Sequence, residues 1–147
     1  MTLQRTIIFT TGILIAVGFA ESQAGGPEPL CEFTIEINAL RGGSPTVALG
    51  GTRNVTAKAR ILKQTAPSGT TIDTTLRVDA VDGSTVINSH SSSPHQLVIG
   101  KGGTGDTFPM SILECNSGSI DFVATFFGIA ANGAPCEATR TITKTCQ

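Results

Sequence analysis

The stretch SIDFVATFFGIA, residues 119–130, decides the expected fold of this chain. Apolar side chains occupy alternate positions of it, namely Ile120, Phe122, Ala124 and Phe126. Alternate residues of an extended strand point to the same face, so this spacing predicts a strand with one apolar face. The opposite face carries Val123, Phe127 and Ile129, which are also apolar. A strand that is apolar on both faces is typical of the centre of a sheet, and we expect residues 119–130 to lie there.

The same two-residue period recurs along the chain, and no segment after the leader has the three- to four-residue spacing of an amphipathic helix. Turn dipeptides such as Asp82-Gly83 and Asn132-Gly133 separate the runs. Loops are expected at residues 41–44, 66–70, 89–94 and 101–105. Strands are expected at residues 31–39, 55–62, 72–80, 85–88, 96–100, 107–114, 119–130 and 137–144. This pattern predicts an all-β protein, an antiparallel immunoglobulin-like β-sandwich of seven to eight strands.

The first 24 residues have the features of a secretory signal peptide. Arg5 precedes an apolar run from Ile7 to Ala20, and Ser22-Gln23-Ala24 has the small-x-small pattern that signal peptidase cleaves. The apolar run is shorter than the roughly 20 residues that a membrane-spanning helix needs. We therefore expect a leader at residues 1–24, a single domain at residues 25–147, and a secreted protein in the periplasm or outside the cell. No membrane insertion of the mature chain is expected.

Composition excludes some classes of partner. The formal net charge is -1, and the local basic cluster of Lys58, Arg60 and Lys63 has no aromatic residues between its members. Nucleic-acid binding normally needs a basic surface, with aromatic side chains for stacking on single strands, so no nucleic-acid partner is expected. The chain also has no Trp and no Tyr, on which sugar rings usually stack, and this argues against a lectin.

No pattern of catalytic or metal-binding residues stands out. His90 and His95 are the two histidines, and they lie on a serine-rich segment without a neighbouring carboxylate, a poor site for a divalent metal. No serine has the neighbours of a nucleophile elbow. The glycine-rich run Lys101–Asp106 lacks the Lys-Ser/Thr ending of a phosphate-binding loop and is expected to be a flexible connection. We expect a protein that is not an enzyme and has no catalytic residue, metal or cofactor.

The strand layout resembles that of bacterial secreted immunoglobulin-like, fibronectin-like and cell-adhesion-related (CARDB-like) modules. The resemblance rests on five runs spread over most of the mature chain: Gly51–Ala59, Leu76–Val78, Asp82-Gly83, Leu97–Ile99 and Gly118–Phe122. CARDB-like modules tend to end in paired asparagines, whereas this chain ends in Thr145-Cys146-Gln147. The resemblance implies a role in adhesion, spacing or protein docking.

Four cysteines, Cys31, Cys115, Cys136 and Cys146, lie in the predicted exported part, and an even number in an oxidising compartment predicts two disulfides. In an immunoglobulin-like sandwich the first and last strands run parallel, which brings Cys31 and Cys136 to the same end. Cys115 and Cys146 then lie at the opposite end. We therefore predict the pairs Cys31–Cys136 and Cys115–Cys146.

The outward apolar residues Val123, Phe127 and Ile129 are the candidate interface. Either a neighbouring loop covers them, or they form a docking surface or a fibre contact. Three functions follow: a non-catalytic binding, adhesion or structural module, a self-assembling fibre or sheath subunit, or an inhibitor or accessory domain that presents the segment 89–94 to an enzyme. In each, the partner is another protein or a copy of this chain. Asn54-Val55-Thr56 also matches the N-glycosylation sequon, a pattern that arises easily by chance.

Overall fold

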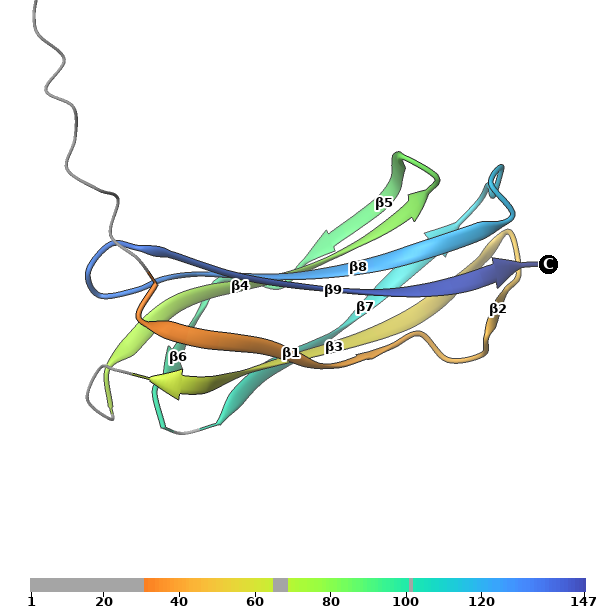
Figure 1. The fold of residues 1–147 in the computed structure, drawn as a ribbon. Helices are drawn as coiled ribbons and strands as arrows, with labels where there is room; N and C mark the ends of the chain where they lie inside the picture. Colours follow the sequence, from red (N-terminus) through yellow and green to blue (C-terminus); the bar gives the residue numbers. More distant parts are fainter. Residues whose placement is uncertain (1–30, 65–68, 101) are drawn as a thin grey trace, which may run out of the picture.

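The alternating segments form β-strands in the computed structural model, which describes residues 31–64, 69–100 and 102–147 (Figure 1). The strands are β1 (Phe33–Arg41), β2 (Thr46–Val47), β3 (Gly51–Gln64), β4 (Thr71–Asp82), β5 (Thr85–Ser91), β6 (His95–Val98), β7 (Gly103–Ile112), β8 (Ser119–Ile129) and β9 (Pro135–Cys146). No helix occurs in these ranges, so the prediction of an all-β protein is confirmed. Within them there is accordingly no helix that could span a membrane. The predicted leader, residues 1–24, lies outside the described residues.

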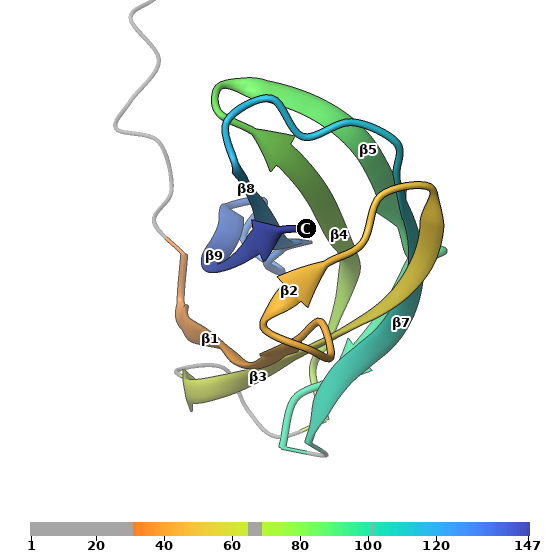
Figure 2. The same ribbon diagram turned by 90° about the vertical axis from the view of Figure 1, so that its right-hand side faces the viewer.

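The strands form two sheets that curl around a shared interior (Figure 2). One sheet has the order β1-β3-β7 and is antiparallel. The other has the order β2-β9-β8-β4-β5, and β6 pairs with β4 beyond the end of β5. As expected for a strand that is apolar on both faces, β8 lies inside its sheet, between β9 and β4.

Two details of the predicted fold class were wrong. The second sheet is mixed, because β2 pairs parallel with β9 at Thr46–Thr145 and Val47–Cys146. The described residues also form nine strands, rather than seven to eight. β2 has only two residues, which is too short to show an alternating pattern in the sequence.

Three predicted loops are partly strands. Arg41, the first residue of the predicted loop 41–44, is the last residue of β1. Ser89–Ser91 continue β5 past residue 88, where the sequence predicted that this strand ends. They do so because the long strand β4 offers them backbone partners at Arg77–Asp79. Gly103–Gly105 begin β7 and pair with β3. A Cβ atom on Gly103 would lie 2.2 Å from the carbonyl oxygen of Ala59, so glycine there permits a backbone approach that a side chain would prevent. A glycine-rich run that resembles a flexible linker is therefore a strand that lies close to its neighbour.

The core lies between the sheets and receives side chains from both. Phe122 and Phe126 of β8 are fully buried, as are Val55 of β3 and Met110 of β7. Side-chain hydrogen bonds tie the sheets together along their edges. The Asn88 amide of β5 donates to the carbonyl of Ser111 on β7 over 2.9 Å, and the Arg140 guanidinium of β9 donates to the carbonyl of Ile37 on β1 over 3.0 Å.

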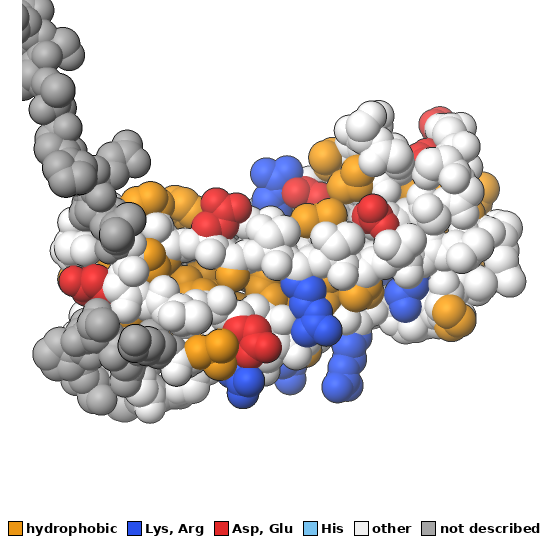
Figure 3. Space-filling model, in the orientation of Figure 1, with side chains coloured by type: hydrophobic (Ala, Val, Ile, Leu, Met, Phe, Trp, Pro, Cys, Tyr) orange, Lys and Arg blue, Asp and Glu red, His pale blue; other side chains and the backbone are white. Residues whose placement is uncertain are grey.

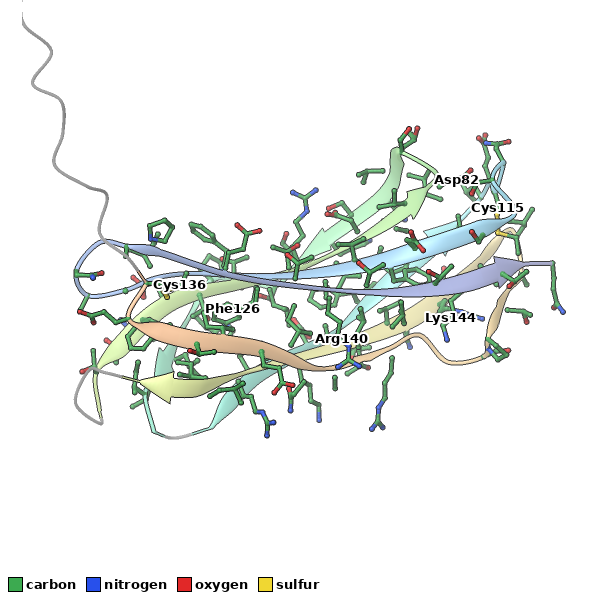
Figure 4. All side chains as sticks on the ribbon, viewed as in Figure 1. Asp82, Cys115, Phe126, Cys136, Arg140 and Lys144 are labelled. Atoms are coloured by element: carbon green, nitrogen blue, oxygen red, sulfur yellow. A yellow bond between two sulfur atoms is a disulfide. The ribbon has the colours of Figure 1, made fainter. Side chains whose placement is uncertain are left out.

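Disulfides join Cys31 to Cys136 and Cys115 to Cys146, which are the two pairs expected from the strand layout. The first pair lies where β1 and β9 begin, and the second where β9 ends, so the bridges brace opposite ends of the molecule (Figure 4). Disulfides form and persist in oxidising surroundings, and two of them indicate a periplasmic or extracellular environment.

Removing the bridges should destabilise the protein in proportion to the loops they close. Cys31–Cys136 spans 105 residues and Cys115–Cys146 spans 31. By restricting the unfolded chain, the first bridge raises the free energy of unfolding by about 5 kcal/mol and the second by about 4 kcal/mol. We expect the variant Cys31→Ala/Cys136→Ala to lose more free energy of unfolding in urea than Cys115→Ala/Cys146→Ala. Equal stability of either variant and the wild type would contradict this prediction.

Candidate functional site

Two large apolar side chains are exposed on the outer face of the central strand β8. The exposed fractions of Phe127 and Ile129 are 42% and 41%, whereas Val123 on the same face is half-buried. The loops that the structure describes therefore leave Phe127 and Ile129 open. We call this pair the β8 patch.

Carboxylates flank the β8 patch on both sides. Phe127 lies opposite Glu137 of β9, and Ile129 lies opposite Asp73 of β4. Directly opposite residues of an antiparallel pair have Cβ atoms about 5 Å apart, so each apolar side chain has an acidic neighbour at contact range. Pro135, opposite Ile129 on β9, extends the apolar surface.

The outer face of the β4-β8-β9 sheet is acidic as a whole. Its carboxylates are Asp73, Asp79, Asp121 and Glu137. Its guanidinium, Arg77, is already bonded to Asp79 over 2.8 Å. In the part of the chain that the structure describes, no ion pair involves Asp73 or Glu137.

The outer face of the opposite sheet is basic and is hollowed by a groove. A volume of about 680 Å³ is lined by residues that include Lys58, Arg60 and Leu62 of β3, with Gly103 and Gly105 of β7. Arg60 bonds to Glu36 over 2.9 Å, whereas Lys58 has no ion-pair partner among the described residues. Figure 3 shows most Lys and Arg side chains in the lower half of the molecule and most Asp and Glu side chains in its upper half, with some Asp or Glu side chains also on the lower strands.

Glycines shape the floor of this groove. In the β3–β7 register Gly105 lies opposite Lys58 and Gly103 lies opposite Arg60. A Cβ atom on Gly105 would lie 2.7 Å from Cγ of Lys58. Glycine at these two positions lets β3 and β7 approach closely beside the two cations. Leu62, with an exposed fraction of 53%, adds an apolar wall to the groove. We call this feature the β3–β7 groove.

The histidines do not come together in a metal site. The described residues contain no group of three or more His, Cys, Asp or Glu side chains that could hold a metal ion. Nε2 of His95 is hydrogen-bonded to the Thr104 hydroxyl, and His90 lies on β5 opposite Val78. Asn54 of the sequon lies exposed on β3, opposite Pro109 of β7.

Sequence reasoning missed a buried carboxylate. Asp82, at the end of β4, is only 7% exposed and accepts hydrogen bonds from the backbone N–H groups of Asn116 and Ser117, at 2.6 and 2.8 Å. These bonds lower the pKa of Asp82, that from Asn116 most, because they stabilise the charged form. Figure 4 shows Asp82 beside Cys115, so the carboxylate and the disulfide hold the same β7–β8 connection. The Asp-Gly dipeptide indicated only a turn, since the partners of Asp82 lie more than thirty residues away.

Sequence reasoning also missed exposed apolar residues at the Cys115 end. Leu113 is 73% exposed, Val86 50% and Leu49 47%. They stand singly on different segments and form no row along one strand, so no periodic signal could find them. Single exposed apolar residues are common on soluble proteins.

Comparison with known proteins leaves the chain without an assigned family. No family model matches it, and no curated protein matches. Among solved structures it is similar to the alkylpurine DNA glycosylase AlkC of Pseudomonas fluorescens bound to DNA, with a TM-score of 0.44 and 14% identity over 77% of this chain and 30% of that one. It is also similar to a β-glucosidase of Listeria innocua, with a TM-score of 0.39 and 11% identity over 78% of this chain and 16% of that one. The chain spans less than a third of the length of either.

The acid response of the fold should depend on Asp82. Because its pKa is lowered in the folded state, its contribution to stability is complete above the unfolded value of about 4 and is lost as the pH falls through the lower, folded value. Asp82→Asn should lower the Tm at neutral pH, and its difference from wild type should shrink below about pH 4. Asp73→Asn, an exposed carboxylate on the same strand, is the control. A constant difference in Tm between Asp82→Asn and wild type from neutral to acid pH would contradict this assignment.

The two neighbouring phenylalanines of β8 should differ in their effect on stability. Phe126 is fully buried and Phe127 is not. We expect Phe126→Ala to cost about 3 to 5 kcal/mol of unfolding free energy because it leaves a cavity. Phe127→Ala should cost about 1 kcal/mol or less. Equal losses in urea titrations would show that Phe127 is packed against another part of the chain.

Proposed function

We propose that this chain is a secreted, non-catalytic β-sandwich of immunoglobulin-like type that acts as a binding, adhesion or structural module at the cell surface or outside the cell. The division of strands supports the immunoglobulin-like type, since β1, β3 and β7 lie apart from β4, β8 and β9. This corresponds to the separation of strands A, B and E from C, F and G in immunoglobulin sandwiches. We also propose a likeness to CARDB-like modules at the level of the fold. Shared architecture is not shared function, so the role is argued from the surface.

The observation that carries the proposed role is the exposure of Phe127 and Ile129 on a central strand. The backbone of the central strand β8 is hydrogen-bonded to a neighbouring strand on each side, so its outward side chains are held in fixed positions. Adjacent exposed apolar residues with a polar rim are typical of contact sites. Here the rim is Asp73 and Glu137. We propose that the β8 patch is where a protein partner binds.

The inhibitor alternative receives less support. That function needs a protruding loop, and the segment expected to present it, residues 89–94, is partly β5. Only Ser92–Pro94 connect β5 to β6, and the backbone and side chain of Ser92 bond to Leu76 of β4.

Site-specific crosslinking tests the proposed contact. A benzophenone side chain placed at position 127 should capture a protein partner in the native secreted fraction. The same probe at Val86, which is exposed on β5, is the control. We expect capture at 127 to be several-fold stronger, and excess unlabelled wild-type protein to compete. Equal capture at both positions, or none at 127, would contradict the proposal.

A further inference from the structure

We propose that the partner of the β8 patch is a second copy of this chain, which offers its β3–β7 groove. This inference rests on the proposed function and names the partner. The two features lie on opposite outer faces of the sandwich, so each copy can use both at once. A contact between two different surfaces of the same molecule can be repeated from copy to copy. It builds an open filament unless the rotation between copies closes a ring.

Charge complementarity is the first argument. The β8 patch lies between Asp73 and Glu137, and the described residues provide no ion-pair partner for either. The β3–β7 groove carries Lys58, which also has no such partner, and Arg60, which is shared with Glu36. Opposite charges on two separate faces of one molecule favour the approach of unlike faces and oppose the approach of two like faces.

Shape and polarity provide the second argument. Phe127 and Ile129 are exposed on the outer face of β8, where every outward position carries a side chain. The β3–β7 groove is a hollow of about 680 Å³ on the opposite face, and Leu62 is exposed in its lining. Seating the β8 patch in the groove would cover three exposed large apolar side chains and place carboxylates beside Lys58. A symmetric contact between two β8 patches would instead bring four carboxylates together.

The position of the two features along the strands is compatible with stacking. The β8 patch lies in the last three residues of β8, and the groove lies at the end of β3 and the start of β7. Gly128, between the patch residues, lies opposite Cys136, whose disulfide braces this end of the molecule. Both features therefore belong to the braced end.

The decisive experiment mixes two complementary variants of the mature, oxidised protein and measures mass by sedimentation. Phe127→Glu removes the patch and keeps the groove, and Lys58→Glu damages the groove and keeps the patch. Wild type should form species larger than dimers as its concentration rises. Each variant alone should be a monomer, and an equimolar mixture should form a one-to-one dimer because a single intact contact remains. Lys58→Arg and Val86→Glu are the controls that should assemble like wild type.

The inference is tested by the salt dependence of the mixed dimer and by whether the mixture forms a dimer at all. Raising the salt from about 0.05 to 0.5 M should weaken the mixed dimer by at least tenfold in Kd, since exposed charges are screened. A wild-type monomer at all concentrations, or a mixture that stays monomeric while wild type assembles, would overturn it. If crosslinking at 127 then captures a different protein, the inference fails and the proposed function stands. Thermal unfolding of both variants close to wild type shows that they fold.

Discussion

Two sulfur bridges, one at each end of the molecule, are the constraint on which the rest of this structure depends. Each restricts where β9 can lie, since Cys136 is near its start and Cys146 is at its end. A one-residue slip in β9 would turn its inward side chains outward and would move both cysteines away from their partners. β8 pairs with β9 along its whole length, so the bridges also fix which of its side chains face the solvent. The exposure of Phe127 and Ile129 is a consequence of this fixed register.

The two outer faces then acquire opposite characters from ordinary strand alternation. Most inward positions are apolar on both sheets, and the outward positions are free to differ. On β4, β8 and β9 the charged outward residues are mainly carboxylates, and they lie around an apolar pair. On β3 and β7 the charged outward residues are cations, and they lie beside glycines. The formal net charge of -1 does not reveal this separation, because the negative charge of one face nearly cancels the positive charge of the other. A molecule with unlike faces is suited to directional contacts, which is why the surface favours a binding or assembly role.

Periodicity predicted most of the strands, because alternation needs no knowledge of distant residues. The central place of residues 119–130 followed from apolar side chains at Phe122 and Phe127, on opposite faces. The two-residue β2, the parallel pairing of Val47 and the strand at Gly103 did not follow, since each depends on a neighbour far away in the sequence. For the candidate site, the pattern singled out Phe127 and Ile129 and left open whether a loop covers them. The β3–β7 groove and the bonds of Asp82 needed the register between strands that only the fold provides.

Peptide mapping of the disulfides in protein recovered from outside the cytoplasm tests the central claim most directly. The claim is that two bridges at opposite ends hold β8 in a register that keeps Phe127 and Ile129 outward. Digestion without reduction should yield one linked fragment with Cys31 and Cys136 and another with Cys115 and Cys146. A Cys31–Cys146 fragment, or free thiols at all four positions, would contradict it.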